Sequence, residues 1–382
     1  MTQAQISRTA WDLIYLLKCA LHDRVPDEAR VQAIDQQALY KLAKAHSVAA
    51  MAAMALERCG VIGEEWKQAK GNSVRRTLLL DAERAEICRF MEERGIWYMP
   101  LKGVILKDMY PKLGMREMAD NDILYDITYQ DELCSFMKGR GYSAESVGYT
   151  HHDTYYKEPV YNFEMHTALI DPGRHIKWNQ YYQDVQSRIL PDREGAFAHH
   201  FSNEDFYIYM NVHGCKHYKN AGTGIRSLVD TYVYLSAMSG KLDWGHIERE
   251  CGILGIAEYE RQCRQLAAAV FGTGDVVELT EKEQKVLAFF FSSGTYGTSK
   301  NRILNELRKY LPDQKQITGW TKIKYLLRRA FPNLGFMMQY SPLVRKHKWL
   351  YPGMVLVRLV KGGFFGIGKT IREVSVIQKI KE

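Results

Sequence analysis

The spacing of the apolar residues changes twice along this chain, and this change constrains the fold more than any other feature of the sequence. Up to residue 95 apolar side chains recur every three or four positions, as in Trp11, Ile14 and Leu17, which is typical of amphipathic helices. From about residue 96 to 170 short runs rich in β-branched and aromatic residues follow instead, and helical spacing returns from Asn203 onward. The sequence therefore predicts an α+β fold, in which a small mixed β-sheet core is embedded in a largely helical protein.

The predicted domain organisation follows these changes of spacing. We expect an N-terminal helical region over residues 1–95, an α+β core over 96–200 and a helical domain over 201–299. Residues 300–382 form a basic C-terminal region that we expect to be mostly helical, although the apolar run Met354–Val360 is typical of a strand.

Two carboxylates are predicted to lie side by side on one strand of the core. Residues two apart in a strand project from the same face, so Asp120 and Asp122 would lie close together. Two like charges at that distance are unfavourable unless a cation lies between them, and carboxylate oxygens suit Mg²⁺. Glu164 lies between apolar neighbours in a later strand and would complete a site for two metal ions. His166 shares the face of Glu164 and would contact an acceptor or a phosphate, or make a structural hydrogen bond.

The same acids also fit a turn. Asp and Asn side chains accept hydrogen bonds from nearby backbone amides, and Asn121 between the two acids favours this alternative. On these residues alone both interpretations stay open.

The remaining histidine pairs are interpreted as structural or exposed. His151 and His152 form a dipeptide whose rings should point apart in a strand, and we expect both rings to be exposed. His213 and His217 lie four apart on one predicted helix face, a spacing that zinc sites use. Because no third ligand is evident, a packed or hydrogen-bonded pair is the favoured interpretation.

The order of several short motifs resembles the uncharacterised nucleotidyltransferases of the polymerase-β-like superfamily. The motifs of the core are Leu101-Lys-Gly103, Tyr110-Pro111, Arg116-x-x-x-Asp120-x-Asp122-Ile-Leu124 and Phe163-Glu-x-His166. The resemblance continues in Glu204–Gly214 and Gly224–Asp230, which look like the helical half of that family. It covers most of the chain from about residue 95 to 360.

The resemblance implies a nucleotidyltransferase core that uses Mg²⁺, with two ions, and an NTP such as ATP as substrate. The implied metal ligands and catalytic acids are Asp120, Asp122 and Glu164. Glu164 would also help to deprotonate the acceptor, while Lys102 and Gly103 would lie near the triphosphate. Arg116 would neutralise phosphate charge or brace the acidic loop. The implied reaction transfers a nucleoside monophosphate to an unidentified acceptor hydroxyl and releases pyrophosphate.

Two positions depart from the pattern of the superfamily. Val104 follows Gly103 where Gly-Ser or Gly-Gly is usual, and Asn121 stands between the paired acids where an apolar residue is usual. These departures favour an alternative function: a catalytically degenerate binding protein with the nucleotidyltransferase fold, whose basic C-terminal region docks on RNA or on an anionic membrane surface.

The net charge of +8 is unevenly distributed. Residues 300–382 hold 18 Lys and Arg against 4 Asp and Glu, which leaves a net charge of −6 for residues 1–299. Interleaved aromatic residues make the basic region amphipathic, so it would contact anionic lipid or RNA, cover the nucleotide site, or form a solvated face. The chain lacks an apolar run of membrane-spanning length and a secretion signal, so we expect it in the cytoplasm, with peripheral membrane contact through the basic region.

Overall fold

A five-stranded mixed β-sheet forms where the sequence predicts the α+β core. The computed structural model describes residues 6–365 apart from 146, 149, 173–174, 275–276 and 309–317. The strands are β1 (Tyr98–Pro100), β2 (Asn121–Tyr125), β3 (Ser143–Glu145), β4 (His152–Lys157) and β5 (Tyr161–His166). They lie in the order β1-β2-β5-β4-β3; β2 and β5 are parallel and all other neighbours are antiparallel. The predicted α+β class with a small mixed sheet is confirmed.

Helices make up most of the described chain outside the sheet. The whole chain divides into two compact units, and the sheet lies in the first. The first unit comprises residues 1–215 and 224–295, and the second comprises 216–223 and 296–382. Five helices precede the sheet: α1 (Arg8–Leu21), α2 (Glu28–Gln32), α3 (Gln36–Ala45), α4 (Ala49–Arg58) and α5 (Glu64–Glu93). Three accompany it: α6 (Gly103–Leu106), α7 (Gln130–Gly139) and α8 (Ile176–Tyr181). After the small hairpin of β6 (Ile189–Pro191) and β7 (His199–Phe201) come α9 (Asn203–Lys219), α10 (Ile225–Ala237), α11 (Trp244–Leu254), α12 (Ala257–Phe271) and α13 (Glu281–Ser293).

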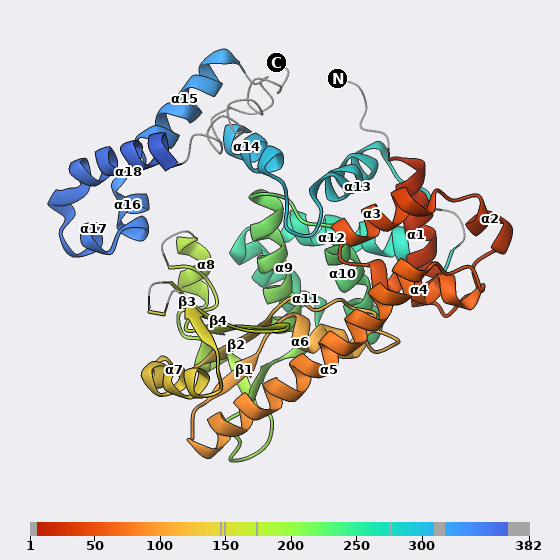
Figure 1. Ribbon diagram of the computed structural model, residues 1–382, viewed down its shortest axis with the longest axis horizontal. Helices are drawn as coiled ribbons and strands as arrows, with labels where there is room; N and C mark the ends of the chain where they lie inside the picture. Colours follow the sequence, from red (N-terminus) through yellow and green to blue (C-terminus); the bar gives the residue numbers. More distant parts are fainter. Residues whose placement is uncertain are drawn as a thin grey trace. The chain divides into compact units, whose positions relative to one another are not determined.

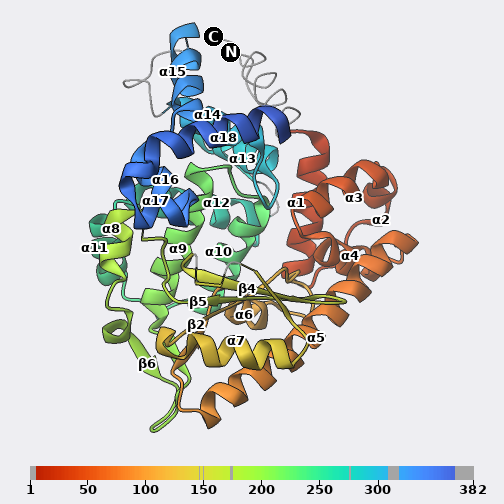
Figure 2. The same ribbon diagram turned by 60° about the vertical axis from the view of Figure 1, so that its left-hand side comes forward.

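One face of the sheet packs against α5 and α7, which lie together on the same side of the strands (Figures 1 and 2). Ile123 and Tyr125 of β2 are buried in the core that these two helices form with the sheet. Phe163 and Met165 of β5 are fully buried in the same core. The alternate residues of both strands must therefore face the other side of the sheet.

The opposite face of the sheet packs against α9. Leu124 of β2 is buried in a second core together with Phe206 and Tyr209 of α9. Asp122 is two residues from Leu124, so its side chain lies on this α9 face rather than on the α5 face. The fold thus places the predicted acids on the side of the sheet that the helical half covers.

His46 joins the N-terminal helices to the start of α10. It caps the C-terminus of α3, is 1% exposed, and its Nδ1 accepts a hydrogen bond from the backbone N–H of Ile225 at 3.2 Å. Gly224 is packed against this ring, because a Cβ added there would lie 2.8 Å from His46 Nδ1. The same Cβ would lie 2.8 Å from the backbone nitrogen of Thr295, and these close approaches together explain why a glycine precedes α10.

The described residues of the second unit from 296 onward form the helices α14 (Ser299–Arg308), α15 (Gly319–Ala330), α16 (Leu334–Tyr340), α17 (Pro342–Lys346) and α18 (Tyr351–Phe365). Ile303 and Tyr325 pack α14 against α15. The expectation of a strand over Met354–Val360 is wrong, because this run lies inside α18. A short run of consecutive apolar residues shows neither the helical nor the strand spacing, so the residues on either side of it decide which of the two forms. Among the helices in the described ranges, none combines the length and apolar character that crossing a membrane would need.

Candidate active site

The parallel pairing of β2 and β5 brings the predicted acids together. Asp122 is the register partner of Glu164, and Leu124 is the partner of His166. One ligand atom of each of Asp122, Glu164 and His166 lies within 4.8 Å of the other two. These three side chains form the centre of the candidate site.

Asp122 holds two cationic or hydrogen-bonding partners at once. Lys102 Nζ donates to Asp122 Oδ1 at 2.8 Å, and His166 Nε2 lies 2.8 Å from the same oxygen. His166 Nε2 is also 3.6 Å from Glu164 Oε2. Asp122 is 4% exposed and His166 is 3% exposed, so this network is largely screened from water.

The charges of the network determine how its members titrate. Burial alone would raise the pKa of Asp122, but Lys102 and His166 outweigh it and lower that pKa. For Lys102, burial favours the neutral amine, yet the charge of Asp122 raises its pKa above the usual value. Burial lowers the pKa of His166, but its hydrogen bonds to Asp122 and Glu164 produce a net rise. The site therefore stabilises an ionised Asp122 next to the ammonium group of Lys102 and the imidazole ring of His166.

Asp120 lies just before β2 and is half-buried. Burial, followed by the negative charge of Asp122, raises its pKa. Asp120 is not one of the three residues that converge within 4.8 Å, although its charge interacts with that of Glu164. The raised pKa is the behaviour expected of a carboxylate that lies near like charges.

Lys102 adopts a backbone conformation that is rare for a residue with a side chain. Its φ is 48° and its ψ is −111°, at the position that precedes α6. Such a conformation costs free energy and persists where the surrounding structure enforces it, often at functional sites. In this protein the unusual conformation lies at the turn between β1 and α6, and from this turn the Lys102 side chain reaches Asp122.

Gly103 follows Lys102 directly, and the Arg116 side chain approaches it too closely to leave room for a Cβ. A Cβ at this position would lie 2.5 Å from Nη1 of Arg116. Arg116 is itself held by Asp230 of α10, to which it donates from Nε at 2.7 Å and from Nη2 at 3.0 Å. Tyr110 OH donates to the same carboxylate at 2.6 Å. Of the two roles predicted for Arg116, this buried geometry supports the brace of the acidic loop.

Asp230 is a residue whose role the sequence reasoning missed, although it ends one of the quoted motifs. The motif Gly224–Asp230 covers the first turns of α10, and its members contact the segment before β2. Besides the Asp230 contact, Arg226 donates to the backbone oxygen of Glu117 at 3.1 Å. The sequence feature that could have indicated this role is the spacing of Arg226 and Asp230, which lie four residues apart and hence on one helix face.

The two departures from the superfamily pattern point away from the site. Val104 is buried in the core on the α5 face of the sheet. Asn121 is fully buried, and its Oδ1 accepts a hydrogen bond from Nη1 of Arg84 on α5 at 3.0 Å. Asn121 points to the face opposite Asp122, because the two are consecutive residues of one strand.

The interpretation of His151 and His152 as exposed, diverging rings is wrong. Their ring centroids are 4.7 Å apart, and both rings are half-buried. His151 precedes β4, so the alternation of strand side chains does not apply to it. Both rings also approach His166, at 5.7 Å and 5.1 Å between centroids.

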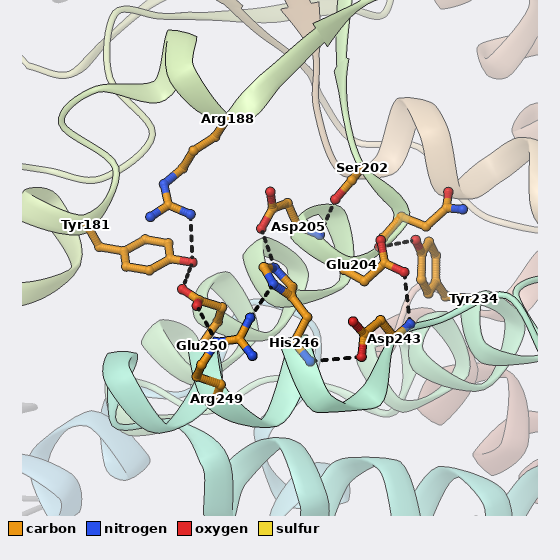
Figure 3. Close-up of polar contacts among 11 residues, drawn as sticks. Tyr181, Arg188, Ser202, Glu204, Asp205, Tyr234, Asp243, His246, Arg249 and Glu250 are labelled. Carbon is orange, nitrogen blue, oxygen red and sulfur yellow. Dashed lines mark hydrogen bonds and ion pairs between the residues drawn. The ribbon is translucent and has the colours of Figure 1, made fainter.

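The first turn of α9 explains the motif that begins at Glu204. Glu204 Oε1 accepts a hydrogen bond from the backbone N–H of Asp243 at 3.0 Å, and Asp205 Oδ1 lies 3.4 Å from His246 Nε2 (Figure 3). Arg249 Nη2 donates to His246 Nδ1, so the ring nitrogen that faces Asp205 carries the hydrogen of the neutral ring. These contacts fix α11 against α9, whose other side covers the sheet.

Comparison with known proteins gives one family. The model of a family described as uncharacterised nucleotidyltransferase matches residues 32–272, which is more than half of the chain. No curated protein and no solved structure matches the chain. The matched range contains every residue of the candidate site described above.

Proposed function

The chain belongs to the family of uncharacterised nucleotidyltransferases, and from this premise we propose that it transfers a nucleoside monophosphate from an NTP to an acceptor hydroxyl and releases pyrophosphate. The observation that carries the proposal is the convergence of Asp122 and Glu164 on the α9 face of the parallel pair β2 and β5. Asp120, two residues before Asp122, adds a third carboxylate.

The donor set fits Mg²⁺. Carboxylate oxygens are the ligands that this hard cation prefers, and Asp120 and Asp122 carry like charges whose proximity a cation would relieve. The residues that would hold Mg²⁺, as one or two ions, are Asp120, Asp122 and Glu164. A bound Mg²⁺ would supply neutralisation of the charge on the transferring phosphate.

The chain's own residues would do the remaining work by position and charge. Lys102 and Gly103 would lie beside the triphosphate, where the ammonium group of Lys102 adds positive charge. Glu164 is the best-placed base for the acceptor hydroxyl, because its side chain is 25% exposed whereas that of Asp122 is 5% exposed. His166 would hold Asp122 in place through the hydrogen bond of 2.8 Å.

The test is a screen of NTPs and candidate acceptors that follows pyrophosphate release, with Asp120→Asn and Asp122→Asn as variants. We expect each variant to lower the rate by at least about 10²-fold, since positioned charge carries most of such catalysis. Asp131→Asn, which changes an exposed carboxylate on α7, is the matched control and should leave the rate unchanged. Full activity in Asp122→Asn would contradict the proposal.

A second candidate function, contact with an anionic membrane, is favoured by one face of α15. Trp320 (71% exposed), Ile323 and Leu327 (54% exposed) follow the i, i+3, i+7 spacing of a single helix face. Lys324 and Arg328 are exposed next to this face. We infer that α15 binds anionic lipid rather than RNA, because burial of apolar side chains in the lipid interface adds to the attraction of the basic residues.

Cosedimentation of the full chain with vesicles checks this inference. Vesicles that contain phosphatidylglycerol should bind the chain and neutral phosphatidylcholine vesicles should not, with binding reduced by salt. The double variant Trp320→Ser/Leu327→Ser should lose most of the binding. Leu113→Ser, an exposed apolar residue of the first unit, is the control. Binding that is unchanged in the double variant, or stronger for RNA than for vesicles, would refute lipid contact through α15.

A further inference from the structure

Three imidazole rings converge at the end of the candidate site where β4 begins and β5 ends. One ring nitrogen of each of His151, His152 and His166 lies within 4.8 Å of a ring nitrogen of the other two. The antiparallel register of the strands makes His152 the direct partner of His166. The backbone oxygen of His151 accepts hydrogen bonds from the N–H groups of Thr167 and Ala168, which anchors the first histidine to the end of β5.

The hydrogen bond of His166 leaves one of its nitrogens available. A carboxylate can only accept hydrogen bonds, so the Nε2 that faces Asp122 carries the hydrogen, and the lone pair of the neutral ring is on Nδ1. Within the described ranges, His166 Nδ1 is buried and has no hydrogen-bond partner. Buried polar atoms usually have a hydrogen-bond partner, so an unpaired one calls for an explanation such as a bound water or ion. A histidine that binds a metal through one nitrogen and donates to a carboxylate through the other is the usual arrangement in metal sites.

His152 completes the pattern. Its Nδ1 is also buried and without a hydrogen-bond partner among the residues that the structure describes. Its Nε2 lies 3.9 Å from Glu164 Oε2, so a carboxylate lies beside this ring as well. The side chain of His152 is 27% exposed, which gives an ion access from solvent.

We propose that His151, His152 and His166 bind a divalent transition-metal ion, of the class that prefers imidazole nitrogen, at a site adjacent to the three carboxylates. Imidazole suits Zn²⁺ and Co²⁺, whereas Mg²⁺ prefers oxygen ligands. The ion would tie the start of β4 to the end of β5 and hold His166 from the side opposite Asp122. This site does not depend on nucleotide transfer, and it differs from the proposed Mg²⁺ site in both ligands and metal.

The test uses Co²⁺ as the probe, with the full chain free of any added histidine tag and treated with a chelator beforehand. In excess Mg²⁺, Co²⁺ should bind to the wild-type chain, and the complex should absorb visible light. Added Zn²⁺ should abolish this absorption, because it competes for the same site. Further Mg²⁺ should leave the absorption unchanged. His151→Gln and His152→Gln should each weaken Co²⁺ binding by about 10-fold or more. The double variant His199→Gln/His200→Gln, a second adjacent histidine pair on β7, should bind Co²⁺ like the wild type.

Two further measurements keep the outcome clear. Asp120→Asn removes a carboxylate of the proposed Mg²⁺ site and should leave Co²⁺ absorption unchanged. Zn²⁺ should raise the melting temperature of the wild type but not that of His152→Gln, while the melting temperatures without metal show whether the variant folds. Absence of Co²⁺ absorption, binding that is unchanged in both histidine variants, or equal loss in Asp120→Asn would overturn the proposal. If the chain binds Co²⁺ but shows no nucleotide transfer, the result would support the histidine site and contradict only the proposed function.

Discussion

At the scale of single residues, two consecutive residues of β2 face opposite sides of the sheet, one toward the candidate site and the other toward the core on the α5 face. Asp122 faces α9 and binds Lys102 and His166, whereas Asn121 faces α5 and binds Arg84. The unusual residue between the paired acids is therefore a partner of α5. It gives no reason to expect a degenerate site.

Asn121→Val tests this separation. We expect the variant to keep nucleotide transfer within about two-fold of the wild type, because the side chain lies on the other face of the sheet. The loss of its hydrogen bond to Arg84 should lower the free energy of unfolding by about 1 kcal/mol, while Arg84 keeps its ion pair with Asp81. Steady-state kinetics and urea denaturation measure the two effects. If Asn121→Val loses activity as completely as Asp122→Asn while it remains folded, our assignment of the two faces is wrong.

At the scale of elements, α10 holds the segment that leads into β2. Arg116 and Asp230 form a buried ion pair with two hydrogen bonds, and Tyr110 donates a third bond to the same carboxylate. Gly103 at the start of α6 packs on the guanidinium group. The position of Lys102 and Gly103, the proposed phosphate-binding residues, therefore depends on a helix that is more than a hundred residues away in the sequence.

Asp230→Asn should destabilise the protein strongly. It leaves the buried Arg116 without its counter-charge, and breaking a buried pair in this way typically costs about 3–5 kcal/mol of unfolding free energy. Urea denaturation followed by circular dichroism measures the loss. Glu281→Gln, which breaks the exposed pair of Glu281 with Lys285, serves as the control and should have no measurable effect. Equal stability of the two variants would show that the Arg116 pair does not brace the structure.

At the scale of the whole first unit, His46 connects the N-terminal helices with the helical half. Burial lowers the pKa of His46 to about 4, from an ordinary value of 6.5. The folded protein therefore keeps this ring neutral, whereas the unfolded chain takes up a proton as the pH falls below about 6.5. Because the unfolded state then binds more protons, the contribution of His46 to stability is present above pH 6.5 and declines as the pH falls toward 4.

This linkage predicts a pH-dependent difference between the wild type and His46→Gln. From pH 7 to pH 4 the wild type should lose about 3 kcal/mol of unfolding free energy through His46 alone. The variant lacks the titrating ring, so its stability should fall less over the same range. Denaturation curves at several pH values provide the measurement. Parallel pH profiles of the two proteins would contradict a buried, neutral His46.

The local pattern of residues determined the class of the fold and the strand face on which Glu164 and His166 lie. Changes of apolar spacing predicted helices, then strands, then helices, and alternation within a strand placed Glu164 and His166 on the face opposite Phe163. Both inferences succeed because the period of a strand or helix is a local property of the backbone. The same logic failed for Met354–Val360, where a run of seven residues is compatible with either period and the helix of Tyr351–Phe365 prevails.

The tertiary structure alone decided which of these residues meet. No local pattern indicates that β2 pairs with β5, that Lys102 reaches Asp122, or that Arg116 meets Asp230 across 114 positions. Nor does it bring His151 and His152 to His166, since the strand rule predicted diverging rings. The physical reason is that a local period selects a face of a strand or helix, whereas strand order and helix packing select the neighbour, and these depend on how the whole chain buries its apolar surface.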